Sequence, residues 1–286
     1  MKNFINRLLL LLSILSFSFP AEVFFSNVIK QGDSNSILLR AQTKLNNPEL
    51  NYNNKTIPMH LIYYGPEKYV YRCVIGTDPL TSVGVKKVKI ILQDQTLLAL
   101  SFTVTKNNFQ EEYIAIPEAK KGALTNKNLV NEGNIIGSKF KEITKQAKWR
   151  DRFIMPAEGR ISSPYGAQRK YNVNNIAWWH KGVDIANSIG TPVLTPNDGT
   201  IILTGSYAVH GKTIMIDHGQ GIVSVFNHLN SIDVNEGDFV KKGKKVATMG
   251  NTGNSTGPHL HWGLSVNNVR VNPLQWVNNR FAPNYF

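Results

Sequence analysis

The sequence contains a single cysteine, Cys73, among 286 residues. One thiol cannot form a disulfide within the chain, nor can it supply a cysteine-rich zinc site. Any bound metal must therefore be held by histidine and carboxylate side chains, and seven histidines are present. Cys73 itself lies in a largely apolar run, residues 70–75, which predicts a buried strand residue and not a reactive thiol.

Acidic residues are also scarce. The chain has 19 Asp and Glu against 32 Lys and Arg, a net charge of +13 that favours polyanionic surroundings such as nucleic acid, membrane surfaces or cell-wall polymers. Residues 1–150 hold 20 basic and 11 acidic side chains, whereas residues 151–286 hold 12 and 8. The second half thus lacks a basic face, and the chain lacks RNA-binding, phosphate-loop and zinc-finger motifs, so we expect no nucleic-acid partner.

The N-terminus lacks an apolar run of the ~20 residues that a membrane span needs. Two basic residues precede an uncharged stretch at residues 8–19, which is typical of an export signal. We therefore expect residues 1–21 to be a signal peptide, cut between Ser18 and Ala21, with no stable membrane insertion afterwards. An uncleaved membrane anchor is the alternative. No cysteine stands at the cleavage point, which excludes a lipid-anchored signal.

The rest of the chain predicts a mainly β protein in three parts. Short β-type runs between turn clusters predict a β-sandwich over residues 22–105. Residues 106–150 are rich in Lys, Asn and Glu and read as a linker with a helix, because apolar residues recur at helical spacing after the possible cap Asn126: Leu129, Ile136, Phe140, Ile143 and Ala147. Residues 151–286 combine alternating strands with glycine-rich turns, which predicts an antiparallel β domain.

Three histidine clusters in this last part suggest a metal site. His180 and Asp184 are four residues apart, with Gly182 permitting a turn between them. His259 and His261 are two apart, so a strand would project both imidazoles from one face. Two histidines and one aspartate would give zinc three ligands and leave the fourth position for water, as in catalytic zinc sites.

Two further histidines would then remain for proton transfer, and His228 at the end of an apolar strand is a candidate. The chain has no His-Glu-x-x-His motif, so imidazole would have to replace the glutamate base of helical zinc proteases. The pair Trp178-Trp179, just before His180, has two alternative interpretations. It either belongs to the core or forms the wall of a substrate groove.

Residues 153–273 resemble the LytM/lysostaphin-type zinc endopeptidases of bacterial cell walls. The motifs that carry the resemblance are Ser163-Pro-Tyr-Gly166, His180-Lys-Gly-Val-Asp184, Gly190-Thr-Pro-Val193, Asn197-Asp-Gly199, His228-Leu229 and the run from Gly250 to His261. The resemblance implies a compact antiparallel β domain with a groove. It also implies zinc (Zn²⁺) on His180, Asp184 and His261, with His228 and His259 as the catalytic histidines.

The sandwich, which opens with Gln31-Gly32-Asp33, resembles the Ig-like domain that precedes this peptidase domain in some exported bacterial members. The expected order is signal peptide 1–21, Ig-like domain 22–105, linker 106–150 and peptidase domain 151–286. The resemblance implies a substrate in peptidoglycan, with cleavage of D-Ala to diaminopimelate cross-links. An exported protein would meet this substrate in the periplasm or cell envelope, in a Gram-negative cell by analogy.

A non-catalytic murein-binding adaptor or amidase activator is the alternative function, since such relatives have lost ligands. This chain keeps all five positions, which favours the enzyme. Residues 23–150 contain no catalytic constellation, and we expect them to regulate access to the groove. A simple spacer or a murein-binding module is the alternative. If these residues restrict access to the groove, a chain starting near Arg152 would cleave murein peptides faster than the full mature chain.

Overall fold

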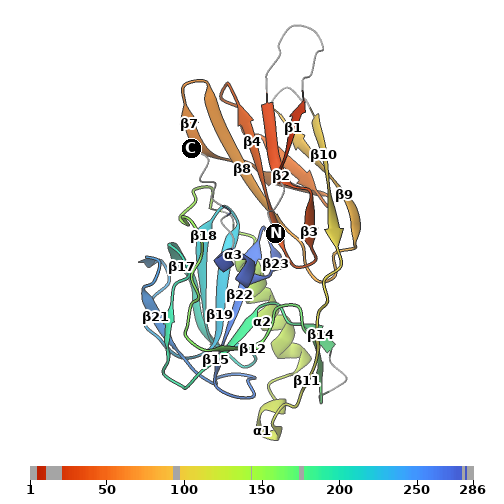
Figure 1. The fold of residues 1–286 in the computed structure, drawn as a ribbon. Helices are drawn as coiled ribbons and strands as arrows, with labels where there is room; N and C mark the ends of the chain where they lie inside the picture. The colour runs from red at the N-terminus through yellow and green to blue at the C-terminus, as the bar shows by residue number, and fades with distance from the viewer. Residues whose placement is uncertain are drawn as a thin grey trace. The chain divides into compact units, whose positions relative to one another are not determined.

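A computed structural model describes residues 5–10, 21–92, 97–142, 144–173, 177–278 and 281. Strands dominate throughout, which confirms the prediction of a mainly β protein (Figure 1). The chain divides into two compact units, Met1–Asn107 and Asn108–Phe286. Most of the segment predicted as a linker, from Asn108 onward, therefore lies in the second unit.

The first unit consists of two five-stranded sheets. Within the sheets all pairs are antiparallel except β3 with β10, which is parallel. One sheet has the order β1 (Ile5–Leu10), β2 (Ala21–Ser26), β4 (Ser34–Ala41), β8 (Lys68–Gly76) and β7 (His60–Gly65). The other has the order β3 (Val28–Lys30), β10 (Leu97–Thr105), β9 (Gly84–Ile91), β5 (Glu49–Tyr52) and β6 (Lys55–Pro58).

Alternate side chains of these strands meet in one apolar cluster. Ile37 and Leu39 of β4 pack with Leu50 of β5 and Ile90 of β9, so the two sheets are layers of a sandwich. Cys73 of β8 lies in the same cluster, and burial raises the pKa of its thiol to about 12. This confirms a buried strand residue without thiolate reactivity. The Ig-like assignment of the sandwich remains a prediction.

Only strand β1 is described within residues 1–20, and its backbone pairs with β2. The other residues of the predicted signal, 1–4 and 11–20, lie outside the described part of the chain, as does Ser18. Among the helices that are described, none has the length and apolar character needed to span a bilayer. The signal peptide remains a prediction.

The second unit is built on a ten-stranded antiparallel sheet. Its main path runs β12 (Arg160–Ser163), β15 (Val183–Ala186), β22 (His259–Val266), β19 (Ile222–Ile232), β18 (Gly211–Gly219), β17 (Gly199–Tyr207) and β20 (Phe239–Val240). Three short strands join this path: β16 (Pro192–Leu194), β21 (Lys245–Met249) and β23 (Val269–Val271). Central strands β18 and β19 are buried on both faces over most of their length, which explains their nearly continuous apolar sequences.

A separate three-stranded sheet lies in the same unit. It has the order β11 (Glu111–Ile114), β13 (Gln168–Tyr171) and β14 (Ala177–Trp179). Strand β11 pairs in parallel with β13, with Glu112 opposite Arg169. A segment predicted as linker therefore contributes a strand next to the histidine motifs.

Three helices complete the described part of this unit: α1 (Glu118–Lys121), α2 (Asn126–Lys139) and α3 (Pro273–Asn278). Helix α2 confirms the predicted helix, although its N-cap is Thr125, whose hydroxyl accepts from the Asn128 N–H. It buries Ile136 against the side chains of Met215, Val223 and Val225 of the large sheet. The helix ends at Lys139, before Ala147, because the following chain turns to hydrogen-bond strand β18; Ile143 lies outside the described residues.

Candidate metal centre

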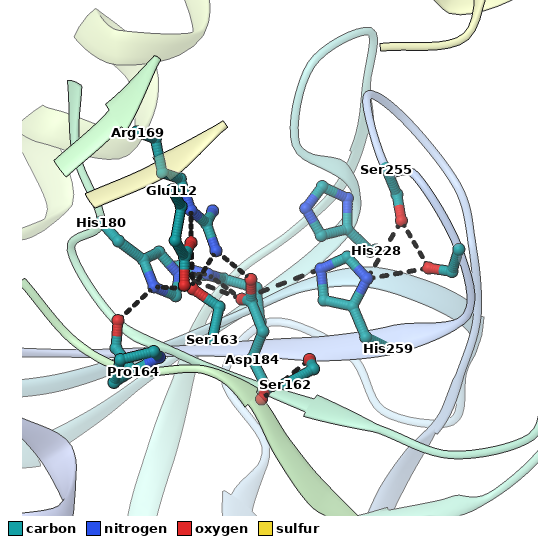
Figure 2. Close-up of polar contacts among 12 residues, drawn as sticks. Glu112, Ser162, Ser163, Pro164, Arg169, His180, Asp184, His228, Ser255 and His259 are labelled. Carbon is teal, nitrogen blue, oxygen red and sulfur yellow. Dashed lines mark hydrogen bonds and ion pairs between the residues drawn. The ribbon is translucent and has the colours of Figure 1, made fainter. Parts of the chain in front are cut away.

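Two neighbouring strands, β15 and β22, bring the predicted ligands together. Their antiparallel register sets Asp184 directly opposite His261, so both side chains project from the same face. His259 lies two residues before His261 on that face, whereas Leu260 between them is fully buried in the core. His180 precedes β15 by three residues and reaches the same point (Figure 2).

His180, Asp184 and His261 form a compact group of metal-ligand atoms. His180 Nε2 lies 3.0 Å from Asp184 Oδ1 and 3.0 Å from His261 Nδ1. His261 Nδ1 lies 2.9 Å from Asp184 Oδ1. Among the described residues, these three are the group of His, Cys, Asp and Glu side chains placed to hold a metal ion.

Neighbouring groups fix the orientation of these three side chains. His180 Nδ1 donates to the Pro164 carbonyl at 2.8 Å, which leaves Nε2 unprotonated and facing the other ligand atoms. Arg169 donates to Asp184 Oδ2, the oxygen that faces away from the histidines. At Gly182 a Cβ would lie 2.7 Å from His261 Cε1, so only glycine leaves room for that ring.

The electrostatics favour a cation at this point. Burial alone would raise the pKa of Asp184, but His180 and His261 outweigh it and hold the pKa well below its ordinary value. Burial lowers the pKa of His261 to about 4, so this imidazole is neutral at pH 7. An ionised carboxylate and two imidazoles that converge on one point match the ligand chemistry of zinc.

His228 and His259 lie beside this group without joining it. Their ring centroids are 4.8 Å apart, and His259 Nε2 is 3.8 Å from Asp184 Oδ1. His259 Nδ1 donates to the Gly257 carbonyl at 2.8 Å, and His228 Nδ1 donates to the Thr252 carbonyl at 2.9 Å. Each Nε2 is therefore left free to exchange a proton. Burial, then the neighbouring histidines, depress the pKa of His228.

A groove of about 390 Å³ opens over these residues. Its lining includes Asp184, His228 and His259 together with residues from four other segments: Glu112, Tyr113, Ile114, Ile116, Ser162, Ser163, Arg169, Tyr171, Asn254, Ser255 and Thr256. The groove thus has one wall from the 251–257 loop and another from the small sheet that contains β11. The size suits part of a peptide chain.

The two tryptophans of the Trp178-Trp179 pair have different surroundings. Trp179 packs edge-on against Phe109, with ring centroids 5.6 Å apart. Trp178 is 39% exposed and contacts Tyr171, a groove residue, at 5.6 Å. Trp179 is only half-buried, so neither tryptophan belongs to the core, and Trp178 approaches the groove only through the lining residue Tyr171.

The sequence analysis did not identify Arg169 or Glu112. Arg169 Nε contacts Glu112 Oε2 at 3.1 Å, and the Ser163 hydroxyl donates to the same oxygen at 2.7 Å (Figure 2). Arg169 lies three residues after the quoted Ser-Pro-Tyr-Gly motif and could have been found from it. Glu112 had no such signal, because it approaches the site only through the pairing of β11 with β13.

Comparison with known proteins finds a family that is similar to this region. The model of "Peptidase family M23" matches residues 179–273. The chain is 36% identical over 124 residues to the peptidoglycan DD-endopeptidase ShyA of Vibrio cholerae, covering 43% of this chain and 29% of that protein. It is 38% identical over 115 residues to the DD-carboxypeptidase/endopeptidase Mpg of Neisseria meningitidis, covering 40% and 26%.

A third relative is an uncharacterized metalloprotease of Haemophilus influenzae, 42% identical over 124 residues that cover 43% of this chain and 26% of that protein. The chain thus spans less than a third of the length of these curated relatives. A solved structure of a putative peptidase M23 from Pseudomonas aeruginosa resembles more of the chain. It has a TM-score of 0.62 and 27% identity, and the match covers 84% of this chain and 92% of that one.

Proposed function

We propose, from the similarity of residues 179–273 to peptidase family M23, that this protein is a zinc-dependent endopeptidase of peptidoglycan. The carrying observation is the convergence of His180, Asp184 and His261 within hydrogen-bonding distance of one another. The ligand-holding contacts of Pro164 and Arg169 support the same assignment. We further propose that His228 and His259 are the catalytic histidines.

A bound zinc ion polarises a carbonyl and lowers the pKa of water at the site towards ~7. His228 and His259 supply proton transfer, because each presents a free Nε2 to the groove while a backbone carbonyl holds its Nδ1–H. One accepts the proton of the attacking water and returns a proton to the leaving amine. The other, when protonated, hydrogen-bonds the carbonyl oxygen as negative charge develops there.

The substrate proposal follows the relatives, whose names give DD-endopeptidase and DD-carboxypeptidase activities. We propose that this protein cleaves the D-Ala to diaminopimelate cross-links of peptidoglycan in the cell envelope. Export by the predicted signal would bring it to the periplasm of a Gram-negative cell. The net charge of +13 suits an anionic polymer.

The alternative is a non-catalytic murein-binding adaptor. An adaptor has no need of three metal ligands or of two imidazoles with free Nε2 atoms. All five side chains are present and oriented in this chain. The enzyme is therefore the better supported function.

Digestion of purified cross-linked murein peptides tests the proposal. We expect the protein to convert dimeric peptides to monomers, to stop in the presence of a chelator and to resume when zinc is added. Mass analysis of the products identifies the bond. The matched control is the Asp184→Asn variant, which keeps the shape of the side chain but removes its charge. Binding of murein by the zinc-loaded wild type without any product would favour the adaptor.

A further inference from the structure

The loop of residues 251–257 holds both proposed catalytic histidines. The Thr252 carbonyl accepts from His228 Nδ1, and the Gly257 carbonyl accepts from His259 Nδ1. The Ser255 hydroxyl also lies 3.1 Å from His259 Nδ1 and donates to the Gly257 carbonyl. Any displacement of this loop would move both imidazole rings. The orientation of both rings therefore depends on the contacts that hold this loop in place.

One anchor is Lys120 of helix α1. Its ammonium donates to the Asn251 carbonyl at 2.9 Å, the Asn251 side chain at 3.1 Å and the Ser255 carbonyl at 2.7 Å. A single side chain thus binds both ends of the 251–255 segment. Two of its three hydrogen bonds are to backbone carbonyls. Because a loop has no regular secondary structure to pair its carbonyl groups, these two depend on such a side-chain donor.

The second anchor is Glu132 of helix α2, a carboxylate that is only 4% exposed. It accepts from the Val209 N–H at 2.9 Å and from the His210 N–H at 3.1 Å, and it contacts His210 Nδ1 at 2.7 Å. These contacts fix the turn between β17 and β18. An ionised side chain with three donors gives stronger hydrogen bonds than neutral groups would.

The turn between β17 and β18 also holds His228 and the 251–257 loop. The His210 carbonyl accepts from the His228 N–H at 3.0 Å, and the Val209 carbonyl accepts from the Asn254 N–H at 2.8 Å. His228 has a φ of +63°, a left-handed conformation that non-glycine residues rarely adopt. The hydrogen bond from its own N–H is one of the contacts that hold it there.

The turn and the loop also approach too closely for side chains. A Cβ at Gly253 would lie 2.6 Å from the Val209 carbonyl oxygen, and one at Gly211 would lie 2.5 Å from the Thr252 carbonyl oxygen. Displacement of the turn would therefore be transmitted directly to Thr252, the acceptor for His228. Glu132 and Lys120 act on the same loop from two different helices.

We infer that Lys120 and Glu132, in the segment ahead of the family match, are positioning residues that orient the imidazoles of His228 and His259. Neither side chain belongs to the metal-ligand group or to the groove lining, and Lys120 reaches the groove only through the carbonyl of the lining residue Ser255. The inference rests on the proposed function for its kinetic consequence, but the ring orientation itself can be measured without substrate.

Glu132→Gln tests the second anchor, Glu132. The amide keeps the side-chain shape, but its NH2 group faces N–H donors where a carboxylate oxygen accepted them. We expect kcat on murein peptides to fall roughly 10-fold to 100-fold, as misplacement of catalytic groups does, with KM and zinc content unchanged. The matched control is Asp217→Asn, which breaks an equally buried carboxylate contact to Thr144 and Lys148 at the other end of β18. It should retain kcat.

Lys120→Met and Lys120→Arg test the first anchor, Lys120. Methionine removes all three hydrogen bonds and should lower kcat, whereas arginine can still donate to both loop carbonyls and should restore most of it. The second readout is the imidazole Nδ1–H resonance of His228 in ¹H–¹⁵N spectra, assigned with His228→Gln. We expect Glu132→Gln to shift or broaden this resonance, and Asp217→Asn to leave it in place.

An unchanged His228 resonance and unchanged kcat in Glu132→Gln would overturn the inference. Equal losses of kcat in Glu132→Gln and Asp217→Asn would also overturn it, because general destabilisation would then explain both. A wild type that cleaves no murein peptide would refute the proposed function instead, while the ring resonance would still report on positioning.

Discussion

At the scale of single residues, a substitution of His261 tests whether zinc binding can be lost while the protein still folds. Its Nδ1 lies 3.0 Å or less from the ligand atoms of both His180 and Asp184, so its loss would leave zinc two protein ligands. We expect His261→Ala to lose most of its zinc on dialysis and nearly all activity. Metal analysis and circular dichroism would check this. Retention of one zinc per chain by a folded His261→Ala protein would contradict the ligand assignment.

The neighbouring His259 should behave in the opposite way. Its Nδ1 is bound to the Gly257 carbonyl, and its Nε2 is 3.8 Å from Asp184, outside the ligand group. We expect His259→Ala to fold, to keep its zinc and to lose turnover by the ~10²–10⁴ usual for a general acid or base. His228→Ala provides the parallel case. Loss of zinc in both variants would place the two histidines in the ligand set.

Sequence reasoning could find these five side chains because each sits in a short local motif. The period of two in His259-Leu-His261 predicted a shared face, and β22 has that geometry. Glu112, Lys120 and Glu132 could not be found in this way. Their partners lie between 51 and 135 residues away along the chain, and only the folded backbone brings them together. From sequence alone, the lysine-rich segment 106–150 that contains Lys120 and Glu132 is equally well interpreted as a helix with a solvent-exposed charged face.

At the scale of elements, His218 at the end of β18 predicts how stability depends on pH. Its ring is fully buried, with Nδ1 at 2.8 Å from the Asp198 carbonyl and Nε2 at 2.9 Å from Ser224 Oγ. Burial lowers its pKa to about 4 from 6.5. Between these values the unfolded chain binds more protons, so acidification destabilises the fold. The contribution of neutral His218 to the free energy of unfolding is fully present above pH 6.5, and it should be lost as the pH falls towards 4.

The size of this effect is on the order of 3 kcal/mol, from about 1.4 kcal/mol for each pKa unit. Denaturant unfolding of the metal-free protein at pH 7 and pH 4.5 would measure it. His218→Gln should be less stable at pH 7 but should lose less on acidification, since the amide does not titrate. His261 remains in both proteins and cancels in the comparison. Parallel pH slopes for the two proteins would contradict the prediction.

At the scale of the whole molecule, the division into two compact units after Asn107 changes the effect expected of an N-terminal truncation near Arg152. The sequence predicted that a chain starting near Arg152 would cleave faster than the mature protein. Such a chain would also lack Lys120, Glu132 and Lys148, which contact the 251–255 loop, the 209–210 turn and Asp217. We therefore expect it to be less stable and to turn over soluble peptides more slowly than a chain starting at Asn108.

A chain starting at Asn108 isolates the role of the first unit, because the division between the compact units falls there. It retains every residue of the metal group, the groove and the two anchors, so we expect full zinc content. If the first unit restricts access, this chain should cleave soluble murein peptides faster than the full mature protein. If the first unit binds murein, soluble peptides should be cleaved equally fast and intact sacculi bound more weakly. Slower cleavage of soluble peptides than by the full chain would contradict both roles, because the first unit would then be needed for catalysis itself.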